Sequence, residues 1–485
     1  MKYIYYYISK FLFIFIFISS KSYSINPLNK RYILNIEGNS DNLYFYYISI
    51  FVGSGKQRQT FILDTTSSIT TSPCNLCSSC GDHFNDYYLI NDHSSIIDIN
   101  SEECNLLPGV SNNFSTEKDF QLYINNCYFE SKLENETISG IYLNNLINFE
   151  SIIFESNSLN EEIIYKNNEF KLPLGCTLKE TGLFKTILTD GIIGLNNNNK
   201  SFISLIFLKK IISNNIFSLC LDKQGGYLSL GNIFDKYHLC PQIKYIDYCP
   251  NNDEYELKIE KIIIKDIEIE INYSSIIDSS STISYFPEKV FNNISIALFE
   301  ICSENEGKCG KLKRIEGYGI CSDFNNKNEF NNTFPYIFPQ IKIFFKNYIF
   351  HWEPKNYLVN LLKNNYGICL GIDTEKNLNK IILGTNFMRG YDIIFDRANY
   401  KIGFCEAVCN RNFRKQNKDK KEKDNNKIKI NNQNIIRNKR NMTNENGFEN
   451  IKNNKVNTTI NNKDKFIEKI HHEYLILLFF IIFIF

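Results

Sequence analysis

Two segments of the sequence place an aspartate after an apolar run and before small hydroxyl-bearing residues. The aspartate is Asp64 in residues 61–68 and Asp278 in residues 275–282. Two carboxyl groups a few Å apart cannot both ionise, so such a pair holds one proton. The ionised carboxylate can activate a water while the protonated carboxyl polarises a peptide carbonyl. The two segments therefore predict peptide-bond hydrolysis by Asp64 and Asp278.

The residues after each aspartate could position this pair. We expect the hydroxyls of Thr65 and Ser279 to bond across the axis between the segments, and those of Ser67 and Ser281 to bond the outer carboxylate oxygens. The alternative is that an aspartate followed by Ser or Thr only makes a turn or a helix cap. A turn or cap would be enough to explain one such segment. It explains less well why the same pattern occurs in two segments.

An apolar run associated with glycine follows each aspartate segment, at residues 190–195 and 381–384. Glycine has no Cβ, so another stretch of backbone can pass close to it. The same order of features occurs twice along the chain. This repetition predicts an internal duplication with a pseudo-two-fold axis, across which Asp64 and Asp278 would meet.

The elements expected around these segments are mostly β-strands. Short runs typical of strands alternate with turn signals, and few stretches have a sustained helical period. The sequence therefore predicts a mostly β fold with a few short helices. The clearest strand signals lie at residues 45–52, 59–63, 262–271 and 338–345, and the clearest helical ones at 202–212 and 288–301.

Both ends of the chain differ from its middle. Residues 1–24 resemble a secretory signal peptide, the alternative being a buried strand. Residues 411–473 are rich in Asn and Lys and predict a flexible stalk. The apolar tail at residues 474–485 is short for a membrane span, and it could instead be an interfacial anchor or part of a lipid-anchor signal. A tail packed on the globular part is the remaining alternative.

Charge is unevenly distributed along the chain. The 485 residues have a net charge of +1, but the stalk carries 17 basic against 8 acidic residues. Residues 25–410 carry a net charge of −11. An acidic globular part argues against nucleic acid as a partner and is compatible with a basic one.

From residue 40 to residue 409 the sequence resembles the pepsin-like aspartic proteases. The resemblance implies a bilobal β fold with a cleft between two lobes, here residues 25–225 and 226–410. It also implies a monomeric aspartic endopeptidase that needs no metal or other cofactor and takes protein or peptide substrates. The supporting motifs lie at residues 217–221, 225–231, 334–337, 382–389, 394–397 and 401–404.

Within this family the chain is most similar to the plasmepsin V branch. A cysteine-rich insert at residues 73–83 directly follows the first aspartate segment, and residues 174–176 and 180–184 also match. The resemblance implies an endoplasmic reticulum setting, and with the signal peptide and the apolar tail we expect a lumenal catalytic domain tethered to that membrane by the tail. It further implies that the enzyme processes exported proteins after a short Arg-containing motif.

The family also has a hairpin flap that closes over the substrate, with a Tyr near its tip. Tyr128 is the candidate for that Tyr, and residues 139–140 resemble the return strand. Glu130 matches a Tyr-x-Glu pattern of the plasmepsin V branch, which implies that it pairs with a substrate Arg through two parallel hydrogen bonds. An exposed turn residue is the alternative for Glu130.

The chain departs from the family at both aspartates, because Thr66 and Ser280 stand where glycine is expected. Their side chains could crowd the catalytic water, or they could add a hydrogen bond and shift the pKa of the pair. The chain is therefore either an active endopeptidase or a weakened or inactive homologue that still binds peptides.

Fifteen cysteines in a secreted chain predict up to seven disulfides and at least one free thiol. Cys74, Cys77 and Cys80, with His83, have spacing that could bind a metal ion, but a secretory route favours disulfides. Cys104 and Cys127 are candidate partners for two of these three. The family resemblance implies the pair Cys321–Cys369, and a Cys220–Cys409 bond that joins the lobes.

Overall fold

The computed structural model describes residues 31–39, 45–91, 94–110, 125–133, 136–157, 160–304, 311–315, 319–323, 338–359 and 367–409. The predicted signal peptide, stalk and apolar tail lie outside the described residues. The chain divides into two compact units, Met1–Arg411 and Asn412–Phe485. The described residues all belong to the first unit.

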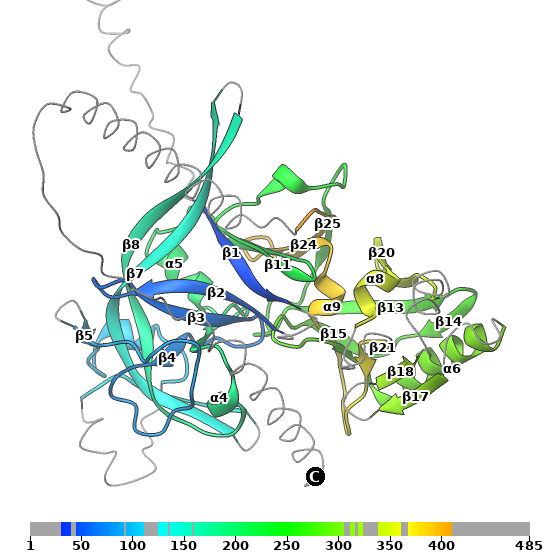
Figure 1. Cartoon of the computed structure of the whole chain (residues 1–485), viewed down its shortest axis with the longest axis horizontal. Coiled ribbons are helices and arrows are strands. Elements are labelled where there is room, and N and C mark those ends of the chain that lie inside the picture. The colour runs from blue at the N-terminus through cyan, green and yellow to red at the C-terminus, as the bar shows by residue number, and fades with distance from the viewer. Residues whose placement is uncertain are drawn as a thin grey trace, which may run out of the picture. The chain divides into compact units, whose positions relative to one another are not determined.

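The fold is mostly β, as the sequence predicted, and one large sheet runs through both halves of the chain (Figure 1). Its strands are, in spatial order, β12 (Lys244–Asp247), β25 (Lys401–Glu406), β24 (Tyr391–Asp396), β10 (Ile216–Leu221), β11 (Gln224–Leu230), β1 (Tyr32–Asn39), β2 (Phe45–Val52), β3 (Gln57–Asp64), β9 (Gly191–Gly194), β4 (Thr71–Pro73), β8 (Asn160–Glu180), β7 (Glu136–Asn157) and β5 (Ser95–Ile96), with β6 (Tyr128–Leu133) paired to β7.

Two smaller sheets belong to the second half of the chain. The larger one orders β20 (Tyr348–Trp352), β19 (Ile341–Phe345), β13 (Glu256–Ile264), β15 (Ser274–Ile277), β23 (Ile381–Leu383), β16 (Ser284–Tyr285) and β22 (Ile372–Asp373), with β14 (Ile267–Glu270) paired to β13. The third sheet contains β17 (Lys311–Ile315), β18 (Gly319–Asp323) and β21 (Gly367–Cys369).

Among the residues that the structure describes, the helices are short, with one exception. The exception is α6 (Glu288–Glu304), which contains the predicted helix at residues 288–301. The others are α2 (Glu102–Asn105), α4 (Leu183–Thr186), α5 (Phe202–Leu208), the 3-10 helix η1 (Asp235–Tyr237), α8 (Pro354–Tyr357) and α9 (Thr385–Met388).

Most predicted strands are present, with two changes of extent. The run at residues 262–271 is divided between β13 and β14 by a turn in which Lys265 has a φ of 55°. The chain therefore folds back there, and Ile264 pairs with Ile267 across a tight hairpin. The run at residues 338–345 contributes its last five residues as β19.

The large sheet joins the two halves of the chain, because β10 from the first half pairs with β24 from the end of the second. Phe217 and Phe395 lie on paired positions, and their rings stack with centroids 4.4 Å apart. The predicted lobe division at residues 225 and 226 falls within strand β11. The expected lobes are thus connected by continuous hydrogen-bonded sheet.

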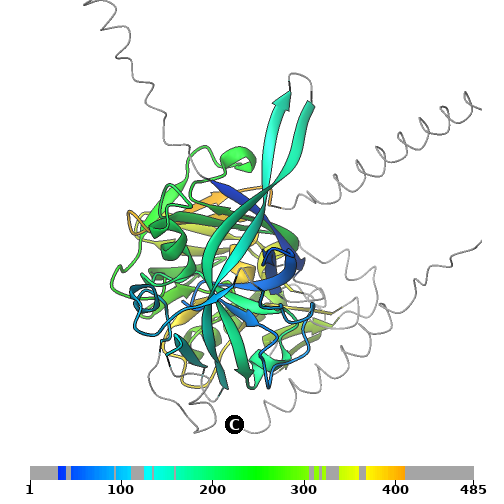
Figure 2. The same cartoon turned by 90° about the vertical axis from the view of Figure 1, so that its left-hand side faces the viewer.

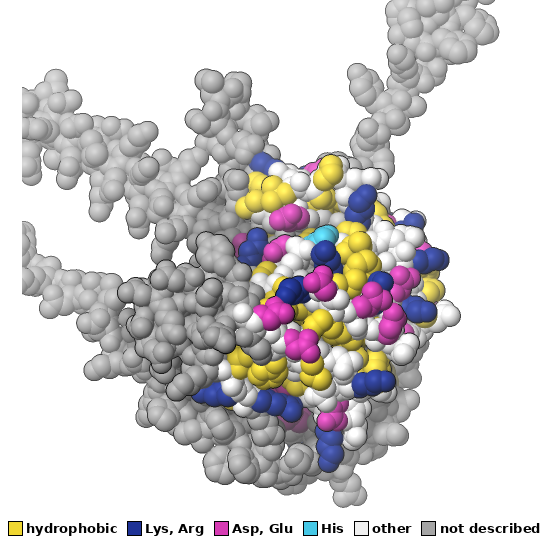
Figure 3. Space-filling view, turned by 90° about the vertical axis from the view of Figure 1, so that its right-hand side faces the viewer, with side chains coloured by type: hydrophobic (Ala, Val, Ile, Leu, Met, Phe, Trp, Pro, Cys, Tyr) yellow, Lys and Arg dark blue, Asp and Glu magenta, His cyan; other side chains and the backbone are white. Residues whose placement is uncertain are grey.

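Strands β7 and β8 form the longest hairpin, and its far end stands clear of the neighbouring strands (Figure 2). At the other end of the hairpin, Leu143 of β7 pairs with Leu174 of β8. Both side chains are buried in the main hydrophobic core. On the face in Figure 3, acidic and basic side chains are interspersed with apolar ones over the described residues.

Candidate active site

Each aspartate segment continues a buried strand that lies parallel to a strand with a glycine at its end, Gly194 as the last residue of β9 and Gly384 directly after β23. Strand β3 pairs with β9, where Asp64 is opposite Gly194, and β15 pairs with β23, where Ile277 is opposite Leu383. This repeated arrangement is the duplication that the sequence predicted.

The glycines allow the close approach that was expected of them. A Cβ on Gly194 would lie 2.4 Å from the carbonyl carbon of Ser68, and a Cβ on Gly384 would lie 2.1 Å from the carbonyl oxygen of Ile283. Both contacts involve backbone, so no other residue fits without moving the chain. Each glycine therefore lets its aspartate loop fold against the neighbouring strand.

Thr65 and Ser279 bind each other across the two halves, as predicted. The Thr65 amide donates to Ser279 Oγ at 3.1 Å, and the Ser279 amide donates to Thr65 Oγ1 at 2.9 Å. Each hydroxyl then donates to a carbonyl of the opposite segment, Thr65 Oγ1 to Ile277 and Ser279 Oγ to Leu63, both at 2.8 Å. Four hydrogen bonds among fully enclosed groups thus fix the two loops side by side.

Asp64 accepts three hydrogen bonds at one oxygen. The donors to Oδ1 are the Thr66 amide at 2.8 Å, the Thr66 hydroxyl at 2.7 Å and the Ser67 amide at 3.0 Å. The Ser67 hydroxyl was expected to bond the outer oxygen. In the described residues it instead accepts from the amide of Ile69 at 3.2 Å, because the loop turns its side chain back on the following backbone.

Asp278 has the matching donors and one more. Its Oδ1 accepts from the Ser280 amide at 2.8 Å, the Ser280 hydroxyl at 2.6 Å and the Ser281 amide at 3.3 Å. Its Oδ2 accepts from the Ser281 hydroxyl at 2.8 Å, as predicted. The two loops therefore share three donors in equivalent positions and differ in the fourth.

Thr66 and Ser280, which replace the expected glycines, thus each donate to the aspartate two residues earlier. Of the two effects considered from the sequence, the added hydrogen bond is present at both positions. A hydrogen bond to the ionised form of a carboxyl group lowers its pKa. The hydroxyls therefore stabilise negative charge on the pair.

The surroundings raise the pKa of Asp64 to about 6. Burial is the largest cause, because it disfavours the charged carboxylate, and the negative charge of Asp278 adds to it. The donors at Thr66 and Ser67 act in the opposite direction and offset part of this rise. An aspartate with a pKa of about 6 beside a second carboxyl group is suited to share one proton with it.

Strands β6 and β7 form a hairpin in the region expected for the flap. Tyr128 pairs with Ile141 at the far end from the turn, and its side chain is buried in the main core. It therefore does not lie at the hairpin tip. Glu130 pairs with Ser139 on the backbone and forms an ion pair with Lys132 at 3.5 Å.

A cavity of about 700 Å³ lies beside the Asp64 loop. It is lined by residues 66–69 of that loop, by Ser131 of β6, by Asn196, and by residues 251–254 between β12 and β13. Successive residues of a strand point to opposite faces, so Glu130 points away from the face on which Ser131 reaches the cavity. Its predicted pairing with a substrate Arg stays a prediction. Residues 251–254 were not anticipated from the sequence, because nothing local marks them.

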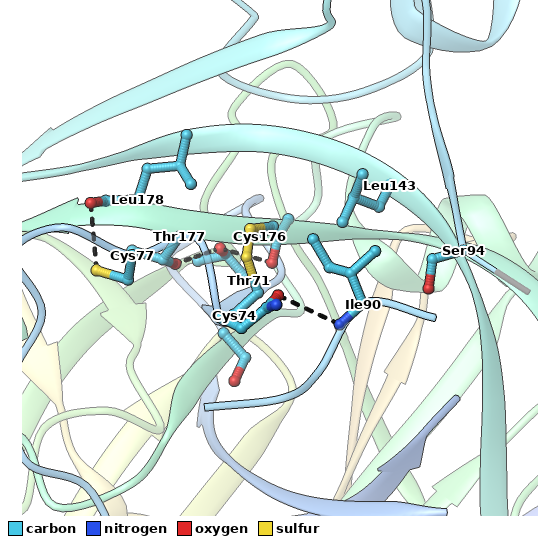
Figure 4. The surroundings of a disulfide bond; sticks show 12 residues. Thr71, Cys74, Cys77, Ile90, Ser94, Leu143, Cys176, Thr177 and Leu178 are labelled. Carbon is cyan, nitrogen blue, oxygen red and sulfur yellow. Dashed lines mark hydrogen bonds between the residues drawn. A yellow bond between two sulfur atoms is a disulfide. The ribbon is translucent and has the colours of Figure 1, made fainter. Parts of the chain in front are cut away.

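The cysteine-rich insert is held by disulfides, and their pairing corrects one prediction. Cys74 bonds Cys176, Cys77 bonds Cys80, and Cys104 bonds Cys127. Cys104 and Cys127 therefore pair with each other and not with the insert, because α2 and the start of β6 place them in a separate small core. Figure 4 shows the Cys74–Cys176 disulfide beside Thr71 and Thr177, whose hydroxyl oxygens lie 2.6 Å apart.

His83 ends the insert in a buried ion pair that the sequence did not indicate. Its Nε2 lies 3.1 Å from Glu180 Oε2 and its Nδ1 lies 2.8 Å from the Ile187 carbonyl, with both side chains almost inaccessible to water. Burial alone would lower the pKa of His83, but the hydrogen bond and charge of Glu180 outweigh it and the pKa is raised. Both ring nitrogens face acceptors, so the charged form satisfies both contacts.

The remaining disulfides include both pairs that the family resemblance implied, Cys220–Cys409 and Cys321–Cys369. A further bond joins Cys240 to Cys405. His238 and these last two cysteines form the one cluster of possible metal ligands among the described residues, but the cysteines are bonded to each other and His238 Nε2 contacts Asp392 at 2.8 Å. Cys249 is the free cysteine of the described part. Such disulfides are typical of the secretory pathway.

No helix among the described residues has the length and apolarity to cross a membrane. The predicted C-terminal anchor lies outside them.

Comparisons with known proteins agree with this geometry. The chain is 25% identical to plasmepsin V of Plasmodium falciparum (isolate 3D7), over 78% of this chain and 73% of that protein. It is 25% identical to aspartic protease 5 of Toxoplasma gondii, over 79% of this chain but 38% of that protein. Among solved structures, conglutin gamma from lupine seeds has the same fold, with a TM-score of 0.59 at 14% identity over 78% of this chain and 96% of that one. The model of the eukaryotic aspartyl protease family matches residues 137–407, more than half of the chain, and the chain therefore belongs to that family of pepsin-like aspartic proteases.

Proposed function

We propose that the chain is an aspartic endopeptidase in which Asp64 and Asp278 activate a water molecule. The observation that carries the proposal is the joining of the two aspartate loops by the reciprocal bonds of Thr65 and Ser279. These bonds hold the carboxyl groups close enough for the charge of Asp278 to raise the pKa of Asp64. A pair that shares one proton has both an acid and a base available at once.

The donors around the two carboxyl groups suggest how the proton is placed. Asp278 accepts at both oxygens, whereas the described partners of Asp64 all contact Oδ1. Hydrogen bonds to a carboxylate favour its ionised form. Asp64, with its raised pKa, is better suited to donate a proton to the substrate carbonyl.

A second candidate function is peptide binding without catalysis. It is favoured by Thr66 and Ser280, which add side chains next to the carboxyl groups where the family has glycine. The shared fold does not decide between the two, since conglutin gamma is described as a seed globulin and a fold does not fix a function. The added hydroxyls donate to the carboxylates, which is compatible with a working pair.

Peptide cleavage by the folded protein with its disulfides intact tests the proposal. The measurement compares the parent with Asp64→Asn and Asp278→Asn across pH 4 to 8. Each variant should lose at least about 1,000-fold in kcat, because the two groups act as a unit. Asp247→Asn, an acid that does not line the cavity of the Asp64 loop, serves as a matched control. Substantial activity in either dyad variant would exclude the mechanism, and an inactive parent that still binds peptides would favour the second candidate.

The finer features of the proposal rest on the plasmepsin V resemblance and on the sequence. They are cleavage after an Arg-containing motif, a monomeric state, and a lumenal position at the endoplasmic reticulum membrane with the tail at residues 474–485 as anchor. Removing residues 474–485 should release a folded, soluble protein from membranes. Continued membrane association of that truncated protein would show that another part of the chain is the anchor.

A further inference from the structure

Asn272, Tyr273 and Ser274 form an Asn-x-Ser pattern, which is the acceptor sequence for N-linked glycosylation. They follow β14 and lead into β15, of which Ser274 is the first residue. The Asn272 side chain is exposed. The disulfides described above are typical of the secretory pathway, in which such patterns meet the glycosylating enzyme. The folded chain can therefore carry a large polar glycan at this position without burying it.

The polar side chains of this pattern are not used by the fold. Neither the Asn272 amide group nor the Ser274 hydroxyl makes a side-chain hydrogen bond among the described residues. The backbone on both sides is held. On one side the Ile271 amide donates to the Glu260 carbonyl at 3.1 Å. On the other side Ser274 pairs with Lys258 of β13. A sugar on Asn272 would thus displace no contact of the sheet.

A cavity of about 420 Å³ adjoins the pattern. It is lined by residues 271–274, by Asp247 and Cys249, and by residues 256–258 of β13. Cys249 is exposed, and it is the free cysteine of the described part. The glycosylation pattern and the free thiol therefore border the same cavity.

A free and exposed thiol is reactive in an oxidising compartment. Its thiolate can attack a disulfide of the same chain or of another protein and form a mixed disulfide. The other cysteines of the described part are in disulfides, so such an exchange would begin at Cys249. A bulky, hydrated group at the rim of the cavity would keep other proteins away from this thiol and would still let small molecules reach it.

We propose that Asn272 is an N-glycosylation site and that its glycan shields Cys249 from other proteins. The donor is an oligosaccharide carried on a lipid diphosphate. Asn272 Nδ2 forms a bond to the anomeric carbon of the sugar, the bond from that carbon to the phosphate oxygen breaks, and the lipid diphosphate leaves while Nδ2 gives up one proton. The charged side chains of Asp247, Glu256 and Lys258 around the cavity can bind the hydroxyl groups of the first sugars. The proposal does not depend on the proteolytic activity.

Peptide mapping of the full chain, produced in a eukaryotic host that makes N-linked glycans, tests the site. Treatment with a peptide-N-glycosidase converts a glycosylated Asn to Asp, and mass spectrometry should find this conversion at Asn272. Asn272→Gln and Ser274→Ala should each abolish the glycan at this position. Ser274→Thr should retain it, because Thr also completes the acceptor pattern. An unmodified Asn272 in the folded parent would overturn the inference.

Labelling of the native protein tests the shielding. A maleimide attached to a long polyethylene glycol chain should modify Cys249 several-fold faster in Asn272→Gln and in the enzymatically deglycosylated parent than in the glycosylated parent. A small maleimide should react with all three at the same rate, which shows that the fold is intact. Cys249→Ser should remove the labelling.

Asn293→Gln is the matched control for shielding. Asn293 is another exposed asparagine in an Asn-x-Ser pattern, but it does not line this cavity. This variant should label at the rate of the parent with both reagents. Equal rates for the bulky reagent with and without the Asn272 glycan would overturn the shielding of Cys249.

Discussion

Thr65 and Ser279 are 214 residues apart in sequence, yet each donates its backbone amide to the hydroxyl oxygen of the other. Both side chains are almost completely buried. Because each hydroxyl also donates to a carbonyl of the opposite loop, removal of one hydroxyl leaves both an amide and a carbonyl of the opposite loop without that partner. The two halves of the site therefore depend on each other for their satisfied hydrogen bonds.

A double-mutant cycle on this pair should show strong coupling. Thr65→Val keeps the side-chain shape but leaves the Ser279 amide and the Ile277 carbonyl unpaired. We expect it to lower the free energy of unfolding by about 3 kcal/mol, and Ser279→Ala by a similar amount. The two variants remove different bonds, but loss of either hydroxyl should loosen the loops and weaken the bonds of the other, so the double variant should lose clearly less than the sum of the two, as measured by denaturant unfolding. Ser229→Ala, which removes one local bond to the Asn232 carbonyl, is the control and should cost about 1 kcal/mol. Additive losses would contradict the coupling.

The Thr66 hydroxyl should affect the pH dependence of activity. It donates to Asp64 and lowers the pKa of that residue, so that it offsets part of the rise caused by burial and by Asp278, which leaves the pKa at about 6. Thr66→Val removes the donor and retains the bulk, so the pKa of Asp64 should rise further. The pair needs one protonated carboxyl group, and the alkaline limb of the kcat/KM profile should therefore move up by about one pH unit. Thr66→Ser keeps the hydroxyl and should leave the limb in place. Identical profiles for the two variants would show that the hydroxyl does not act on the pKa.

The His83–Glu180 pair should make stability depend on pH. The pKa of His83 is raised in the folded protein, so the folded state binds a proton that the unfolded state releases near pH 6.5. The stabilising contribution is therefore complete below pH 6.5 and is lost as pH rises through the higher folded pKa. His83→Gln should lower the free energy of unfolding by about 3 kcal/mol at pH 5.5, and the difference from the parent should shrink at alkaline pH. Guanidinium unfolding at several pH values measures this, with His351→Gln at an exposed position as control. A difference that does not change with pH would show that the pair is not ionised.

The disulfides of the insert should differ in their contribution to stability. Cys74–Cys176 closes a loop between residues 102 positions apart, whereas Cys77–Cys80 spans 3 positions. In the chain-entropy account, the long loop contributes about 5 kcal/mol and the short one about 2 kcal/mol. The double variant Cys74→Ala, Cys176→Ala should therefore lower the unfolding free energy more than Cys77→Ala, Cys80→Ala. Calorimetry or chemical unfolding of the oxidised proteins gives the comparison. A larger loss from the short-range pair would mean that local geometry outweighs loop entropy.

Much of the site could be predicted from the sequence because its residues lie close together in two short segments that share one pattern. An apolar strand, an aspartate and hydroxyl residues occur together in both segments, and the alternation of apolar residues marks the strands that carry them. Gly194 and Gly384 were also recognisable, since a glycine next to a buried strand indicates close backbone contact. From these features the sequence determined the β fold, the pairing of Asp64 with Asp278, and the bonds of Thr65 with Ser279.

Tertiary structure alone decided the features that depend on distant partners. Cys104 pairs with Cys127 rather than with the insert, because the fold places them in a separate small core, and no spacing rule contains that information. The Ser67 hydroxyl accepts from the Ile69 amide, and Glu130 pairs with Lys132. Both side-chain directions depend on the local backbone conformation of the loop or strand, which the sequence pattern does not give. Asp253 lines the same cavity as residues of the Asp64 loop, and its carbonyl accepts a hydrogen bond from Asn197 of the other half of the chain. Local pattern specifies the elements, whereas packing between residues far apart in sequence specifies which side chains face the site.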